Sequence, residues 1–571
     1  MTKTMKRFIS ILISVVMILT LGMAVMAADP TYPVTVTKAN SSDKYIHDLE
    51  LYQIFDAKVH EDSGNLYDAS WGSGVTGTDA IIPELKSITE FASGTTLSNV
   101  IDVLETLGND SAALDSFAKV VAQHLSTTKA TAQIGATETE KSVDLTKPGY
   151  YLVKDTVKDA ADNTLAESKF MLKVVNSTTT AVTIRTKEVV PTLDKKIVST
   201  SGDTDKNTAD VGELITFKLS STVPDLRNSG YNKYCFVMND TLSKGLTYDT
   251  ATAKLTVSIN GQALASSDYT FTKTDNADGT TGLKIVFKDM LTKGQDATLI
   301  GKDIVVTYKA SLNENADLTD AGNPNTANLI YSNDPSHTYT SDEPSGTDPK
   351  GTTPDVETIT YTTGVSLVKV DAEDGSRLDG AEFKIEGTKA DQVISKKQVF
   401  TVNATEGTYY KLKDGTFTTD SPTAATGANY ASEDKYKLEE KNEIVSKDSN
   451  SNVVKTATGT NGELSFNGLG VGTYTITEVT APQGYVLDST PHTVEIKCTF
   501  DATTQKPVWS YSIDGAAATS GPVRLTVTNT KPSSLPSTGG IGTTIFYAGG
   551  AVLVIGGIVL LVLKKRNSEK E

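Results

Sequence analysis

Three polar residues stand at core-facing positions of strand-like runs late in the sequence. Lys369 in VSLVKVD, Glu478 in TYTITEV and Asn529 in RLTVTNT each share strand parity with apolar neighbours two residues away. Side chains alternate between the two faces of a strand, so all three are predicted to point into one apolar core. An isolated buried lysine or glutamate is costly. The pattern therefore predicts either a buried ion pair beside an asparagine or a group of residues that react with one another.

The reactive alternative is amide formation between the lysine and the asparagine. Burial lowers the pKa of a lysine, which leaves a neutral amine, and raises that of a carboxylic acid, which stays protonated. The Lys369 amine can attack the carboxamide carbon of Asn529, while the acid of Glu478 hydrogen-bonds the amide oxygen and assists proton transfer. Ammonia leaves and a Lys–Asn isopeptide bond remains. Proximity in a rigid core supplies the rate.

The segments that carry these residues resemble a known family. GVSLVKVDAEDGSRLDGAEFKI, YTITEVTAPQGY and LTVTNTK are similar to the Cna B-type domain of bacterial surface proteins. The resemblance implies an intramolecular isopeptide bond between Lys369 and Asn529, with Glu478 as its catalytic acid.

An earlier part of the chain repeats the order lysine, acid, asparagine. Lys195 in PTLDKKIV, Asp240 in CFVMNDTLSKGLTY and Asn325 in GNPNTANLIYSND each lie on the parity of apolar neighbours. This region looks like the middle domain of sortase-assembled major pilins. The resemblance implies a second isopeptide bond, between Lys195 and Asn325, with Asp240 as its acid. Lys196 and Asn333 remain alternatives, because Lys196 is adjacent to Lys195 and Asn333 shares the parity of Asn325.

The C-terminal segment combines a short motif, an apolar run and a basic cluster. The motif is LPSTG, made of Leu535, Pro536, Ser537, Thr538 and Gly539. An apolar run over 541–563 follows, long enough to cross a bilayer as a helix, and then a basic cluster over 564–566 that stays cytoplasmic. The arrangement is similar to the sorting signal of Gram-positive surface proteins. The resemblance implies that a sortase cuts between Thr538 and Gly539 and passes the Thr carbonyl to an amine.

A lysine at an expected domain junction is the candidate for that amine. In AVTIRTKEVVPTLDKK, Lys187 stands a few residues before Pro191. Pilins of this class carry a motif resembling VxVYPK at this place, although its Tyr-Pro pair is absent here. The resemblance implies that Lys187 accepts Thr538 of the next subunit, with Lys195 or Lys196 as alternatives. Such a head-to-tail contact does not close and generates an open filament.

The N-terminal residues have the layout of a secretory signal peptide. Lys3, Lys6 and Arg7 precede an apolar stretch over 8–25, and small residues follow at 27–28. We expect cleavage after Ala27.

The elements that position these groups are expected to be strands. Thr, Ser, Val, Gly and Asp are abundant, and alternating apolar runs dominate. We predict a mainly β chain of three tandem Ig-like, Cna-type β-sandwich domains, with a C-terminal transmembrane helix in the precursor. Apolar residues at helical spacing over 97–104 and 114–125 predict a helical insertion in the first domain. The expected divisions are 1–27 (signal peptide), 28–188 (N-terminal pilin domain), 189–364 (middle isopeptide-forming domain), 365–531 (Cna B-type domain) and 532–571 (sorting signal).

Composition and missing motifs limit the function. The formal net charge is −17, which argues against nucleic acid as a partner. The five histidines are scattered without ligand spacing, and no CxxC, GxSxG or phosphate loop is present. We therefore expect no metal, no cofactor and no enzyme activity beyond the autocatalytic crosslinking. Cys235 and Cys498 are expected to be buried thiols rather than a disulfide.

The resemblances together imply a structural subunit of a covalently polymerised surface pilus, or fimbria, of a Gram-positive bacterium. Sortase would join its subunits head to tail, and the fibre would be anchored to peptidoglycan and support adhesion. The implied partners are a class C sortase, a housekeeping sortase, other copies of the chain, ancillary pilins and peptidoglycan. The alternative is a monomeric wall-anchored adhesin or an ancillary (basal) pilin.

Overall fold

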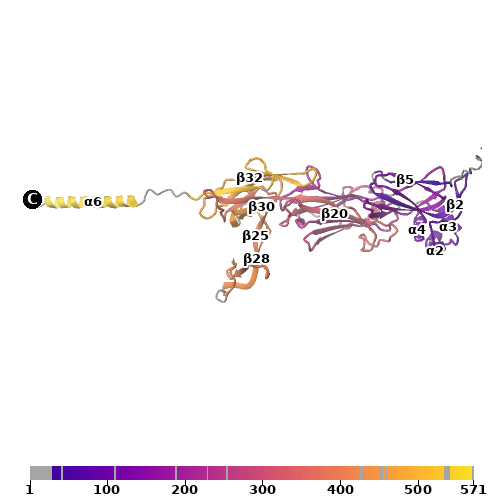
Figure 1. The fold of residues 1–571 in the computed structure, drawn as a ribbon, viewed down its shortest axis with the longest axis horizontal. Helices are drawn as coiled ribbons and strands as arrows, with labels where there is room; N and C mark the ends of the chain where they lie inside the picture. The colour runs from indigo at the N-terminus through magenta and orange to yellow at the C-terminus, as the bar shows by residue number, and fades with distance from the viewer. Residues whose placement is uncertain are drawn as a thin grey trace, which may run out of the picture. The chain divides into compact units, whose positions relative to one another are not determined.

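The computed structural model divides the chain into two compact units, residues 1–362 (unit 1) and 363–571 (unit 2) (Figure 1). It describes residues 29–39, 41, 43–108, 111–186, 190–227, 229–251, 255–423, 429–448, 454–457, 460–521, 523–532 and 541–568. The expected signal peptide, Lys187 and the LPSTG motif lie outside these residues. Strands make up 46% of the chain and helices 13%, which confirms the prediction of a mainly β fold.

Unit 1 begins with two sheets that face each other across an apolar core. One sheet has the order β5-β1-β9, and the other has the order β3-β2-β6-β7, with β4 on β2 and β8 on β6. Val34, Leu51, Val153 and Ile184 from the two sheets are fully or almost fully buried in one core cluster. The strands are β1 (Tyr32–Thr37), β2 (Ile46–Val59), β3 (Leu66–Trp71), β4 (Ala130–Ile134), β5 (Glu140–Leu145), β6 (Gly149–Lys158), β7 (Thr164–Glu167), β8 (Met171–Val175) and β9 (Val182–Arg185).

A helical insertion between β3 and β4 confirms the helices predicted from apolar spacing. Its elements are α2 (Thr78–Leu85), η1 (Thr89–Phe91), α3 (Leu97–Thr106) and α4 (Ala112–Ala122), and Figure 1 draws them beside β2. Thr96 caps α3 through a capping box with Asn99, and Ser111 caps α4 by accepting a hydrogen bond from the Leu114 amide. The apolar helix faces pack on Phe55 and Leu152 of the sheet.

The rest of unit 1 is a second pair of sheets. The first has the order β10-β12-β19-β15-β16 with β14 on β19, and the second has the order β11-β22-β20-β13-β18-β17 with β21 on β20. Its elements are β10 (Asp194–Ile197), β11 (Lys206–Thr208), β12 (Leu214–Thr222), β13 (Phe236–Leu242), β14 (Leu246–Tyr248), β15 (Thr256–Ile259), β16 (Gln262–Ala263), β17 (Tyr269–Asp275), β18 (Thr281–Phe287), α5 (Met290–Gln295), β19 (Asp303–Leu312), β20 (Asn323–Ser332), β21 (Lys350–Thr352) and β22 (Val356–Tyr361).

Unit 2 is built on a seven-stranded sheet, β27-β26-β28-β25-β30-β23-β34, and a five-stranded sheet, β29-β24-β31-β32-β33. Its first strand β23 pairs in parallel with its last strand β34. The elements are β23 (Thr363–Asp371), β24 (Glu382–Glu386), β25 (Gln392–Val402), β26 (Tyr409–Leu412), β27 (Phe417–Thr418), β28 (Tyr430–Ser446), β29 (Val454–Ala457), η3 (Thr460–Gly462), β30 (Glu463–Leu469), β31 (Gly472–Thr480), β32 (His492–Phe500), β33 (Pro507–Ile513), β34 (Arg524–Asn529) and α6 (Ile541–Ser568).

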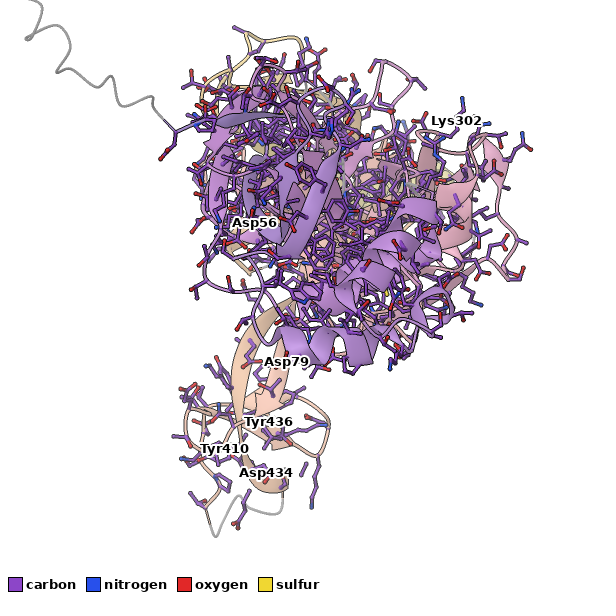
Figure 2. All side chains as sticks on the ribbon, turned by 90° about the vertical axis from the view of Figure 1, so that its right-hand side faces the viewer. Asp56, Asp79, Lys302, Tyr410, Asp434 and Tyr436 are labelled. Carbon is purple, nitrogen blue, oxygen red and sulfur yellow. The ribbon has the colours of Figure 1, made fainter. Side chains whose placement is uncertain are left out.

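Unit 2 has two further features, a long apolar helix and a long pair of strands. Helix α6 contains a span, Thr544–Lys565, that is long and apolar enough to cross a membrane, as predicted. Strands β25 and β28 pair over eleven residues each and form a hairpin that the sequence did not predict. Figure 2 shows Tyr410, Asp434 and Tyr436 near the far end of this hairpin.

The N-terminal sheets of unit 1 enclose a charged cluster instead of a lysine–asparagine pair. The ring of His47 is fully buried, and its Nδ1 lies 3.0 Å from Asp155 Oδ1 while its Nε2 lies 3.0 Å from Asp43 Oδ2. Burial disfavours the charged ring, but the hydrogen bonds to both carboxylates outweigh burial and raise the pKa of His47 to about 9. Nearby, the buried Lys38 amine donates to the backbone oxygens of Asp43 and Gly135 at 3.1 and 2.9 Å.

The charge of His47 gives this part of the chain a pH-dependent stability. Because the pKa is raised above its unfolded value, the stabilisation is complete below about pH 6.5 and is lost as pH rises through about 9. Over that interval the free energy of unfolding should fall by about 3 kcal/mol. Urea unfolding of a Trp509→Phe chain, in which Trp71 of β3 is the remaining tryptophan, would measure the fall.

The matched control is His47→Gln, which keeps a polar side chain but cannot titrate. The free energy of unfolding measured through Trp71 should be lower in this variant at pH 6 than in the unmodified chain. It should also be nearly independent of pH between 6 and 9.5. If the stability of the chain with His47 is equally independent of pH, the charge of His47 is not the source of the pH dependence.

Candidate functional site

Unit 2 brings together the three residues predicted from strand parity, which we call the C-terminal site. Lys369 lies on β23, Glu478 on β31 and Asn529 on β34, and all three are buried. The Lys369 amine donates to Asn529 Oδ1 and lies 3.3 Å from Glu478 Oε1. Asn529 Nδ2 donates to the same Oε1 at 3.0 Å. One carboxylate oxygen therefore contacts both nitrogen atoms.

The surroundings shift the titration of the amine at this site. Burial lowers the pKa of Lys369, and the opposing attraction of Glu478 does not cancel that effect. The Asp488 amide donates to Glu478 Oε2 at 3.0 Å, so both carboxylate oxygens of Glu478 have fixed partners. The arrangement can hold a nucleophilic amine next to a carboxamide and an acid–base group.

Unit 1 holds a second such cluster, the middle site, between its second pair of sheets. Lys195 lies on β10, Asp240 on β13 and Asn325 on β20, and their side chains are buried. The Lys195 amine donates to Asp240 Oδ2. Burial lowers the pKa of Lys195 in spite of the attraction of Asp240.

A fourth residue, Tyr308 on β19, completes the middle site. Its hydroxyl donates to Asp240 Oδ2 at 2.8 Å, accepts from Asn325 Nδ2 at 2.7 Å and lies 3.1 Å from Lys195 Nζ. The sequence analysis missed Tyr308, although its strand parity with Ile304 and Val306 in DIVVTYKASL places it in the core. The oxygens Asp240 Oδ1 and Asn325 Oδ1 are buried without a hydrogen-bond partner among the described residues.

The sequence alternatives for the middle site lie elsewhere. Lys196 points away and pairs with Asp205 at 2.6 Å, and this hydrogen bond raises its pKa. Asn333 donates from Nδ2 to the backbone oxygen of Leu165 at 3.2 Å. Neither has a hydrogen bond to Asp240 or Lys195 among the described contacts.

Next to the C-terminal site, a second cluster holds the end of β34. The Lys531 amine lies 2.8 Å from Asp371 Oδ2, and the Tyr485 hydroxyl donates to the same oxygen at 2.8 Å. The Lys531 hydrogen bond is the main cause that lowers the pKa of the buried Asp371 to about 2. The Val486 amide also donates to the oxygen of Thr530. The chain is therefore fixed just beyond Asn529, a feature that sequence reasoning missed because its partners are far apart in sequence.

The structure describes the residue next to the expected acceptor Lys187, but not that lysine itself. Thr186, the residue before Lys187, is buried and donates its amide to Thr37 at the end of β1. Lys187 and residues 535–539 lie outside the described residues. Within the described part of the chain, no group of three or more His, Cys, Asp or Glu side chains is arranged to hold a metal ion.

Comparison with protein families matches two segments of the chain. Residues 433–507 match the SpaA family, described as a prealbumin-like fold domain, and residues 527–570 match the LPXTG cell wall anchor motif. The chain is also 26% identical over 401 residues to the trypsin-resistant surface T6 protein of Streptococcus pyogenes serotype M6, with 67% of this chain and 70% of that protein covered.

Solved structures of pilins also align with the chain. The T6 backbone pilin of Streptococcus pyogenes aligns with a TM-score of 0.49 and 16% identity, covering 89% of this chain and all of that one. The major pilin SpaD of Corynebacterium diphtheriae aligns with a TM-score of 0.45 and 15% identity, covering 88% and 98%. Together, the family matches and the T6 relative support the resemblance seen in the sequence, and the chain is a Gram-positive, cell-wall anchored surface protein similar to the sortase-assembled major pilins.

Proposed function

We propose that the protein is the structural subunit of a covalent surface pilus whose domains are crosslinked from within. The observation that carries the proposal is the presence of two clusters that each join a buried lysine, a carboxyl group and an asparagine by hydrogen bonds, directly at the C-terminal site and through the Tyr308 hydroxyl at the middle site. The proposed bonds join Lys369 to Asn529 and Lys195 to Asn325. The domain divisions 28–188, 189–364 and 365–531 are part of the proposal, supported by the three pairs of sheets.

The proposed reaction needs no group beyond those in each cluster. At the C-terminal site the neutral Lys369 amine attacks Cγ of Asn529, and Glu478, which contacts both nitrogens, moves the proton from one to the other. The Cγ–Nδ2 bond breaks and ammonia leaves. At the middle site Asp240 acts as the acid. Each event occurs once per molecule, so the protein is not an enzyme in the sense of turnover.

The ion-pair alternative accounts less well for the asparagines. A buried Lys–Glu or Lys–Asp pair needs partners for its remaining hydrogens and lone pairs, but it does not require a carboxamide at van der Waals distance from the amine. The C-terminal site has one, and at the middle site the Tyr308 hydroxyl contacts both the amine and the carboxamide. Burial also lowers the pKa of both lysines, which makes the neutral amine easier to reach than it is for a lysine in water.

The bonds would stabilise the protein in two ways. The C-terminal bond closes a chain separation of 160 residues, and by analogy with a disulfide it would lower the entropy of the unfolded chain by the equivalent of about 5 kcal/mol. The C-terminal bond would also resist mechanical tension along the chain. Strands β23 and β34 are parallel neighbours, so tension on the two ends of unit 2 shears one along the other, and a covalent bond prevents the sliding.

Polymerisation is the second part of the proposal. A class C sortase would cleave after Thr538 and transfer the Thr carbonyl to Lys187 of the next subunit, and a housekeeping sortase would attach the completed fibre, with any ancillary pilins, to peptidoglycan. The LPXTG anchor match and the similarity to pilins support this step. The resulting fibre would present the subunits for adhesion.

Intact mass measures internal crosslinking. The folded ectodomain should weigh about 34 Da less than its sequence, because each bond releases one ammonia of about 17 Da. Glu478→Gln should restore about 17 Da, because only the middle bond still forms, and its melting temperature should fall. Glu495→Gln on β32, at a partly exposed position, is the matched control and should keep the full deficit. A wild-type mass equal to the sequence mass would refute internal crosslinking.

Gel mobility measures polymerisation. Cells producing Lys187→Ala should lose the high-mass ladder on denaturing gels of wall extracts, because the acceptor amine is gone, while the monomer remains wall-bound. Lys196→Ala is the control and should keep the ladder. A ladder that persists in Lys187→Ala and disappears in Lys196→Ala moves the acceptor to Lys196. A wild-type product of a single monomeric band would favour a wall-anchored adhesin.

A further inference from the structure

We propose that Tyr308 is a catalytic residue of the middle-site crosslinking reaction, and that its hydroxyl passes a proton between Lys195 and Asn325. This inference rests on the proposed isopeptide function. It assigns a role to a residue that the sequence pattern of lysine, acid and asparagine does not include.

The two sites differ in how the carboxyl group contacts the asparagine. At the C-terminal site one oxygen of Glu478 contacts both Lys369 Nζ and Asn529 Nδ2. At the middle site Asp240 contacts the lysine, but no hydrogen bond joins it to Asn325 in the described structure. Aspartate is one methylene shorter than glutamate. Asp240 does not make the bridging contact that the longer side chain of Glu478 makes.

The Tyr308 hydroxyl occupies the bridging position. It lies 3.1 Å from Lys195 Nζ, 2.7 Å from Asn325 Nδ2 and 2.8 Å from Asp240 Oδ2. It thus contacts the nitrogen that must lose a proton and the nitrogen that must gain one. Both distances are within the range in which a side chain acts directly in proton transfer.

The hydroxyl of Tyr308 has a different kind of hydrogen-bond partner from those of other buried tyrosines in this part of the chain. The hydroxyls of Tyr231, Tyr331 and Tyr339 donate to backbone oxygens. That of Tyr308 donates to the carboxylate of Asp240 instead. Its ring is stacked on Phe217 with the centroids 5.5 Å apart, so packing also helps to hold the hydroxyl in place.

The proton balance closes without any further group. As Lys195 Nζ bonds to Cγ of Asn325, the nitrogen becomes positively charged and releases one proton to the Tyr308 oxygen. At the same time the hydroxyl turns from Asp240 Oδ2 toward Nδ2 and gives that nitrogen its own proton, the Cγ–Nδ2 bond breaks, and ammonia leaves. Tyr308 ends as it began. Burial raises the pKa of Tyr308, so the hydroxyl keeps a proton to pass on.

The test is Tyr308→Phe in the full ectodomain, which removes the hydroxyl but keeps the stacked ring. Crosslinking is followed by mass at intervals after cell-free synthesis, with peptide mapping to assign each bond. The middle bond should form at least 100-fold more slowly, within the usual range for loss of a proton-transfer group of about 10²–10⁴. The bond at the C-terminal site should form at the normal rate, which provides an internal control in the same molecule.

Two further variants separate proton transfer from packing. Tyr234→Phe is the matched control, because the Tyr234 hydroxyl is buried without a partner among the described residues, and it should crosslink normally. In the double variant, Tyr308→Phe removes the bridging hydroxyl, and Asp240→Glu lengthens the acid by one methylene so that its carboxyl group reaches further. This double variant should regain the middle bond, because the glutamate reaches the amide as Glu478 does.

The outcomes distinguish the inference from the function on which it rests. A Tyr308→Phe chain that forms the middle bond at the wild-type rate overturns the role of Tyr308 and leaves the crosslink standing. A folded double variant that does not regain the bond also overturns the bridging argument. A wild-type chain in which Lys195 stays free overturns both the middle crosslink and the role of its tyrosine.

Discussion

Lys195 and Lys369 each place a primary amine where water does not reach, and this constraint governs the design of both sites. A charged amine in such surroundings costs several kcal/mol unless its partners are well placed. Burial lowers the pKa of both lysines even though a carboxylate lies beside each. The strand pattern that builds the two cores therefore also supplies the proposed nucleophile, since a lysine on the apolar parity of a strand is carried into the core with its neighbours.

The two proposed bonds would resist different deformations. Lys369 and Asn529 lie on neighbouring parallel strands of one sheet, so a bond between them opposes sliding of β34 along β23. Lys195 and Asn325 belong to the two different sheets of the middle region, so their bond opposes separation of the sheets. The acids differ accordingly. Glu478 contacts both nitrogens by itself, whereas at the middle site the phenol of Tyr308 makes the contact with the asparagine nitrogen.

Many of the site residues could be predicted from the sequence, because strand parity depends only on neighbours a few residues away. Parity with apolar neighbours predicts Lys195 and Asp240, and apolar spacing predicts the helical insertion. Parity leaves Asn325 and Asn333 as alternatives, and the family resemblance favours Asn325. Tyr308 was missed because a tyrosine on core parity also fits an ordinary core, and its partners come from three other strands. The hairpin formed by β25 and β28 was missed for the opposite reason: its half-exposed, charge-rich residues, as in KYKLEEKNEIV, lack the alternation of a buried strand.

The most direct test of the central claim is a tryptic peptide map of the purified, denatured ectodomain. Trypsin does not cleave after a lysine whose amine is bonded to an asparagine. The account predicts one branched peptide joining the Lys369 and Asn529 segments and another joining the Lys195 and Asn325 segments, each lighter by about 17 Da than the sum of its linear parts. Cleavage after both lysines, with Asn325 and Asn529 recovered in ordinary linear peptides, would contradict it.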